Sequence, residues 1–139
     1  YSYILRLSRS NNSNEMIHPY IYAGLKADRL IVKDYLSNTP AVHVYQKLLE
    51  CVLEVLRVTK EEIQGKERVR YIVDARKIII HILRENTNMG YMHMGRLMNK
   101  NHATCIHAYN ATNNLLKVDK TFRKNYNLVI LAFENQLNK

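Results

Sequence analysis

The feature that most constrains the fold is a pair of apolar patterns at helical spacing that meet at a short polar corner. The first pattern comprises Met92, Met94, Leu97 and Met98. It is broken at residues 99–101, which read Asn-Lys-Asn. The second pattern follows His102 and comprises Ile106, Ala108, Leu115 and Leu116. Apolar residues three and four positions apart indicate amphipathic helices. The sequence therefore predicts two helices joined by a tight turn, which is the arrangement of a helix-turn-helix.

The polar corner has the residues expected at the start of the second helix. Asn101 can cap that helix with its side-chain oxygen, which leaves His102, Ala103 and Thr104 on its exposed first turn. A helix end with small and polar side chains can enter the major groove of DNA and meet base edges, while Lys100 beside it meets a phosphate. The sequence thus predicts base contacts by Asn101, His102, Ala103 and Thr104.

The run from Ala75 to Ala108 resembles the C-terminal DNA-binding domain of the bacterial replication initiator DnaA. In that family an Ile-Gly pair precedes the signature Asp-His-(Ser/Thr/Ala)-Thr-Val-(Leu/Ile)-His-Ala. Here the pair is similar to Met94-Gly95, and the signature is similar to residues 101–108, N-H-A-T-C-I-H-A. The likeness covers roughly residues 45 to 117. It implies an all-α helix-turn-helix bundle of the DnaA C-terminal, Trp-repressor-like type, in which His102 faces bases.

The sequence also departs from the family pattern at positions that matter for DNA reading. Ala103 stands where the family often has a hydroxyl, and Asn101 stands where it usually has Asp. The turn is one residue shorter than in the family. The family arginine that enters the minor groove corresponds to Asp74, a charge reversal, although Arg68 or Arg70 could reach in instead. The resemblance therefore implies DNA binding but not the base sequence that the initiator reads.

The charge balance favours a polyanionic partner. The chain has 21 Lys and Arg residues against 12 Asp and Glu residues, a formal charge of +9. Cations are concentrated just before and within the helix-turn-helix, and we expect Arg76 and Lys77 on the exposed face of a helix over residues 71–85. The predicted phosphate contacts are Lys66, Arg68, Arg70, Arg76, Lys77 and Lys100.

The chain divides into three parts by composition. Residues 1–14 predict an N-terminal arm and a polar linker, and residues 15–38 predict a tyrosine-rich helical extension. That extension either packs on the following helix or serves a protein partner or self-association. Residues 39–139 form the predicted DNA-binding domain.

Helix signals divide this domain further. Thr39-Pro40 predicts an N-cap and a first helical position, with the helix running to about Val58. Residues 59–62, T-K-E-E, predict a capping box and a short helix that stops at Gly65. Beyond the helix at 71–85, we expect the second helix of the motif over 103–117 and a last helix that begins at Asp119 or Thr121 and runs to about residue 137.

Enzyme and metal chemistry find little support in these residues. Cys51 and Cys105 occupy apolar helical positions, which favours buried reduced thiols over a disulfide or metal site. His102 and His107 are five apart, unlike the four-residue spacing of a helical metal pair. No apolar run of membrane length and no leader pattern occurs in the sequence. We expect no catalysis, no cofactor, no metal, no membrane partner and a cytoplasmic, nucleoid-associated protein of bacterial or phage origin.

Two functions remain at this point. The first is sequence-selective binding of double-stranded DNA in replication initiation or gene regulation. The alternative is a protein-interaction module that keeps the fold but does not read DNA, for which Asp74 and the shortened turn are the best support.

Overall fold

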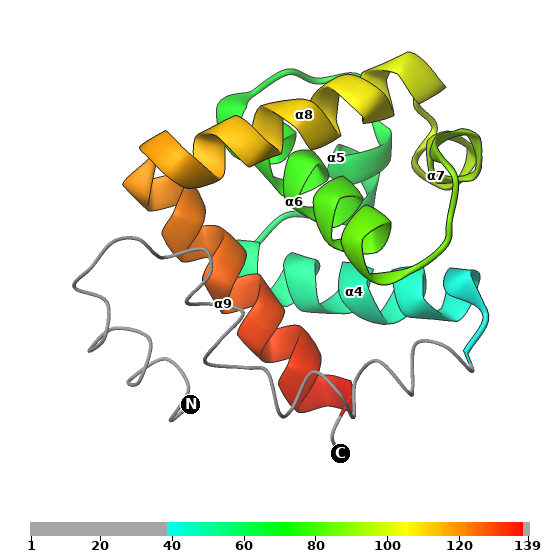
Figure 1. Ribbon diagram of the computed structural model, residues 1–139, viewed down its shortest axis with the longest axis horizontal. Helices are drawn as coiled ribbons and strands as arrows, with labels where there is room; N and C mark the ends of the chain where they lie inside the picture. The colour runs from blue at the N-terminus through cyan, green and yellow to red at the C-terminus, as the bar shows by residue number, and fades with distance from the viewer. Residues whose placement is uncertain (1–38, 138–139) are drawn as a thin grey trace.

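The computed structural model describes residues 39–137, and these residues form α helices and no strand. The helices are α4 (Ala41–Leu56), α5 (Lys60–Gln64), α6 (Arg70–Asn86), α7 (Tyr91–Met98), α8 (His102–Val118) and α9 (Lys120–Leu137) (Figure 1). This confirms the predicted all-α class. The predicted arm at 1–14 and helical extension at 15–38 lie outside the described residues.

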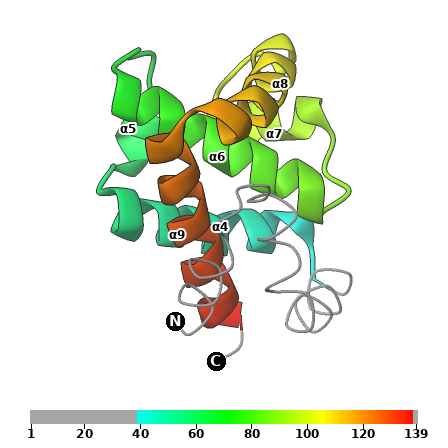
Figure 2. The ribbon, with the colours of Figure 1, turned by 60° about the vertical axis from the view of Figure 1, so that its left-hand side comes forward.

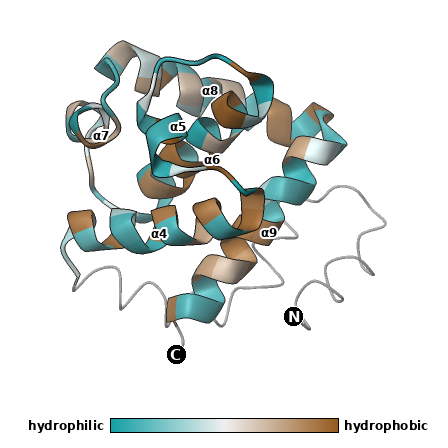
Figure 3. Ribbon diagram, turned by 180° about the vertical axis from the view of Figure 1, so that it is seen from behind, coloured by the Kyte–Doolittle hydropathy of each residue, from teal (hydrophilic) through white to brown (hydrophobic). Residues whose placement is uncertain are grey.

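Helix α6 lies at the centre of the bundle. It packs against α8 on one side and α4 on the other, and α9 descends from the end of α8 to pack against α4 (Figures 1 and 2). Each helix carries hydrophobic residues interspersed with hydrophilic ones (Figure 3), which is the pattern of helices that bury one side. Within the described residues, the short helix α7 makes its most extensive contacts with α8. The helix-turn-helix is thus attached to the bundle chiefly through α8.

The central position of α6 explains its unusual composition. The predicted inward residues are all buried: Ile72, Ala75, Ile78, Ile79, Ile82 and Leu83. Ile80 and His81 are buried as well, because helices cover α6 on several sides. Branched residues in a row are mildly unfavourable in a helix, but burial of a side chain of this size contributes about 1.5–3 kcal/mol, which outweighs that cost.

A buried histidine connects three helices. His81 Nε2 lies 2.8 Å from Asn113 Oδ1, to which it donates, and Nδ1 lies 2.7 Å from the Tyr126 hydroxyl, which donates to it. The ring also stacks on Tyr109, with centroids 4.8 Å apart. Burial lowers the pKa of His81 below its ordinary value of 6.5, although the Asn113 hydrogen bond and the Glu85 charge oppose the shift. The neutral imidazole is therefore the form that this part of the core accommodates.

The helix boundaries agree with the sequence signals to within two residues. The capping box is present, since Thr59 N donates to Glu62 at 2.9 Å and Glu62 N donates to Thr59 at 3.1 Å. The first predicted boundary is wrong by one residue. Helix α4 begins at Ala41 with Pro40, not Thr39, at the cap position, and it ends at Leu56. Proline fits this position because it has no N–H. An N–H at the start of a helix would have no partner within the helix.

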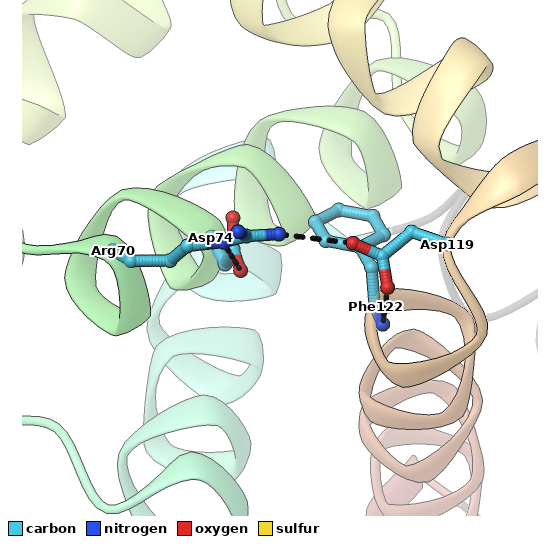
Figure 4. Close-up of polar contacts among 4 residues, drawn as sticks. All are labelled: Arg70, Asp74, Asp119 and Phe122. Carbon is cyan, nitrogen blue, oxygen red and sulfur yellow. Dashed lines mark hydrogen bonds and ion pairs between the residues drawn. The ribbon is translucent and has the colours of Figure 1, made fainter.

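The first turn of α6 is joined to the junction of α8 and α9. Asp119 Oδ1 accepts a hydrogen bond from Phe122 N at 3.0 Å, which caps α9, and Asp119 Oδ2 lies 3.0 Å from Arg70 Nη2 (Figure 4). Arg70 also pairs with Asp74 one turn away, at 3.6 Å. These contacts hold Arg70 at the α9 end of the bundle.

Candidate nucleic-acid interface

The corner between α7 and α8 is a tight turn built by two asparagines. Asn99 has a left-handed backbone, with φ of 59°, which asparagine tolerates better than most residues. Lys100 N then donates to Gly95 O at 2.7 Å and closes the turn. Asn101 Oδ1 accepts from Ala103 N at 2.7 Å, so the predicted cap of α8 is confirmed.

Gly95 allows α7 to approach the turn that follows it. A Cβ at this position would overlap the carbonyl oxygen of Lys100. Its neighbour Met94 is fully buried and fixes the other side of α7 to the core. The Met94-Gly95 pair therefore sets how closely α7 packs on α8, and hence the direction in which α8 begins.

The four residues predicted to contact bases lie together on the surface. Asn101, His102, Ala103 and Thr104 are all exposed at the start of α8, while Cys105 behind them is fully buried. Helix α8 is thus held by its inner side and presents its first turn outward.

A groove lies between this helix and the loop that joins α5 to α6. It has a volume of about 590 Å³. The loop contributes Lys66 and Arg68, and α8 contributes Thr104, His107 and Ala111. Lys66 and Arg68 are exposed, and Lys77, which also lines the groove, is half-buried rather than exposed as predicted. The groove is lined by cations on the loop side and by small and polar side chains on the helix side.

Arg76 is a structural residue, and its predicted exposure is wrong. Its side chain is buried, and its guanidinium donates to four backbone carbonyls at 2.7 to 3.0 Å. The acceptors belong to Glu62, Ile63, Gly65 and Glu67. Burial lowers the pKa of Arg76, while the Glu67 carboxylate opposes the shift. The sequence could not show this, because the carbonyls belong to α5 and to the loop that follows it.

Lys100 connects that same loop to the corner of the helix-turn-helix. Its Nζ donates to Gly65 O, the carbonyl that also accepts from Arg76 at 2.9 Å. Burial lowers the pKa of Lys100, and the Arg76 charge lowers it further. Gln64 Nε2 adds a hydrogen bond to Leu97 O at 3.1 Å. The width of the groove is therefore fixed by contacts between its two sides.

Arg70 is not brought to the groove. Together with Asp74 and Asp119 it lines a different hollow, next to Phe122 (Figure 4). Asp74 lies there too, so the charge reversal seen in the sequence is outside the groove, near the C-terminal end of α8 and not its first turn. Of the six predicted phosphate contacts, the structure gathers Lys66, Arg68, Lys77 and Lys100 beside α8, with Arg76 buried beneath them.

Two groove residues were not singled out from the sequence. His107 lies three residues after Thr104, and Ala111 lies four residues after His107, so both continue the Thr104 side of α8 along the groove. Their spacing was a signal that could have identified them. One expectation for α7 is also wrong, since Met92 is 62% exposed rather than buried with the other methionines.

Other kinds of site are not apparent in residues 39–137. In this range no group of three or more His, Cys, Asp and Glu side chains is placed to hold a metal ion. Cys51 and Cys105 are both buried and unbridged, as predicted. None of the described helices has the length and apolarity needed to span a bilayer.

A capped helix that presents its first turn outward, with a cationic groove beside it, defines a DNA-binding domain of the helix-turn-helix class. Residues 45–111 match the family described as the bacterial dnaA protein helix-turn-helix. The motif in this chain is of the bacterial DnaA type, as the sequence signature indicated, and this supports DNA binding in general.

Three similar proteins carry the same name. The chromosomal replication initiator protein DnaA of Borrelia duttonii is 28% identical over 106 residues, which is 74% of this chain and 21% of that protein. The DnaA of Caldanaerobacter subterraneus is 26% identical over 100 residues, 72% of this chain and 23% of that protein. The DnaA of Flavobacterium psychrophilum is 25% identical over 101 residues, with shares of 72% and 21%. The chain spans about a fifth of the length of these relatives.

Proposed function

We propose that this chain binds double-stranded DNA sequence-selectively, with the first turn of α8 in the major groove. The observation that carries the proposal is the exposed set Asn101 to Thr104, held by a capped helix beside a groove lined by Lys66 and Arg68. Base edges in the major groove present donors, acceptors and thymine methyls that differ between base pairs. The polar and small side chains of this turn match that chemistry.

The proposed roles divide by chemistry. His102 meets a base edge or a thymine methyl, Thr104 offers a methyl and a hydroxyl, and Asn101 can both donate and accept. Ala103 offers only a methyl. Lys66, Arg68 and Lys77 meet phosphates and fix the register without reading sequence. Because Asn101 and Ala103 differ from the usual family residues, the preferred base sequence should differ from that of the initiator.

The name of the relatives supports a proposal for the biological setting. Their name assigns them to chromosomal replication initiation. We place this chain in replication initiation or gene regulation, acting as a non-catalytic DNA-binding module associated with the nucleoid. The double-stranded DNA site is its partner in either case.

The test combines site selection with salt titration. Duplexes selected from a random pool are titrated at several salt concentrations, together with random duplexes, against the chain and its His102→Ala variant. We expect a steep loss of affinity with salt for both proteins, and a lower ratio of selected to random affinity for His102→Ala. His43→Ala is the matched control, because His43 is an exposed histidine on α4. Unmeasurable affinity at low salt would refute DNA binding, and an unchanged ratio in His102→Ala would refute base reading by His102.

A further inference from the structure

A second hollow lies on the other side of the corner from the groove. It has a volume of about 740 Å³ and is lined by Met92, Gly95, Arg96, Asn99, Lys100, Asn101 and His102. The two hollows share the corner residues, but His102 lines this one and Thr104 lines the groove. Two residues along an α helix are separated by roughly 200° of rotation. The start of α8 is therefore flanked by one hollow on each side.

The second hollow carries two cations, Arg96 and Lys100, and no carboxylate, and Lys100 already donates to Gly65 O. Arg96 and Met92 are both exposed and lie four residues apart on α7, so they share one side of that helix. Within residues 39–137, the ion pairs involve Arg70 and do not involve Arg96. Arg96 is thus available to an anion that approaches the corner from outside.

The geometry of the major groove indicates that this anion is a DNA phosphate. The groove is about 12 Å wide, and an α helix with its side chains is about 10–12 Å across. A helix end seated in the groove therefore has a phosphate strand close to it on each side. Lys66 and Arg68 flank α8 on the side of Thr104, and Arg96 flanks it on the side of His102.

The geometry points to Arg96 as a phosphate contact on the DNA strand opposite to the one met by Lys66 and Arg68. This inference rests on the proposed function and deepens it, because it assigns the two sides of the interface to the two strands. The sequence did not indicate it, since every predicted phosphate contact lay in residues 66–77 or at residue 100. Arg96 contributes affinity but carries no sequence preference.

The first experiment measures the salt dependence of Arg96→Gln on selected and random duplexes. Each phosphate contact contributes a slope of about −0.9 in the logarithm of affinity against the logarithm of salt. We expect the slope of Arg96→Gln to be shallower by about 0.9, with the ratio of selected to random affinity unchanged. Arg96→Lys should retain the slope. Lys124→Gln is the control, because Lys124 is exposed on α9 and lines neither hollow.

The second experiment assigns strands. Single phosphates on each strand of the selected duplex are replaced by neutral methylphosphonates, and the affinities of the unmodified chain, Arg96→Gln and Arg68→Gln are compared. We expect Arg96→Gln to become insensitive to replacements on one strand and Arg68→Gln to replacements on the other. An unchanged salt slope in Arg96→Gln, or insensitivity on the same strand as Arg68→Gln, would overturn the inference while leaving DNA binding in place. A flat slope for the unmodified chain would instead refute the proposed function.

Discussion

Replacement of Arg76 should destabilise the fold more than any change of surface charge. Its guanidinium makes four hydrogen bonds to backbone carbonyls at 2.7 to 3.0 Å. Hydrogen bonds to charged groups contribute about 1.5–3 kcal/mol each, but they are not additive. The acceptor at Ile63 is reached through a buried contact, whereas the contacts at Glu62, Gly65 and Glu67 are part-buried, so water can replace some of what is lost. We therefore expect Arg76→Met to lower the free energy of unfolding by about 3 kcal/mol, near the bottom of the range for breaking a buried ionic contact.

The assay is urea unfolding followed by the helical circular dichroism signal. For a domain of this size, 1 kcal/mol corresponds to roughly 4–8 °C in Tm, so thermal unfolding should show the same change. Arg76→Lys separates structure from charge, because an ammonium keeps the charge but cannot reach four carbonyls at once. We expect it to lose nearly as much stability as Arg76→Met. Lys77→Met is the neighbouring control, with a change of about 0.5 kcal/mol or less. A fully stable Arg76→Lys, or a loss below about 1 kcal/mol in Arg76→Met, would refute the structural role.

Three smaller predictions test the corner and the core. Gly95→Ala should cost about 2 kcal/mol because its Cβ overlaps the Lys100 carbonyl, whereas Gly90→Ala, which meets nothing within 4 Å, should be nearly neutral in the same unfolding assay. Asn101→Ala should cost about 1 kcal/mol through loss of the cap of α8, and Asn101→Asp should keep that stability. Because the pKa of His81 is lowered in the folded protein, the unfolded chain binds a proton that the folded chain does not. The free energy of unfolding should therefore fall as pH drops from 6.5 toward the folded pKa, and His81→Gln should flatten this dependence; an equal slope in the variant would contradict the assignment.

Burial along α6 could be predicted from the sequence because periodicity reports which side of a helix faces the core. Ile72, Ile79 and Leu83 are buried as expected. Arg76 and His81 break the pattern for a tertiary reason, since their partners come from the α5 turn and from α8 and α9. A single helical period carries no information about such partners. Polar residues buried in a central helix are therefore where sequence reasoning fails.

The corner could be predicted more fully than its surroundings. The Asn101 cap and the exposed turn at His102 follow from local residue chemistry, and the structure shows both. Met92 was misplaced because α7 has only eight residues and packs mainly on α8, so one side of it is enough to bury Met94 and Met98. The groove was not predictable, because its width depends on the Gly65 carbonyl that Lys100 and Arg76 share.

Arg76 and Lys100 are hydrogen-bonded within the fold, and this changes the salt dependence of DNA binding that the charge alone would predict. Six predicted phosphate contacts would give a salt slope of about −5.4 at −0.9 for each contact. Arg76 and Lys100 donate to backbone carbonyls, and Arg70 is paired with Asp119 in another hollow. The remaining contacts are Lys66, Arg68 and Lys77 in the groove, together with Arg96 on the other side. We therefore expect a slope of about −3.6 on a selected duplex. A measured slope near −5.4 would mean that Arg70, Arg76 and Lys100 leave their partners when DNA binds, and it would contradict a rigid interface.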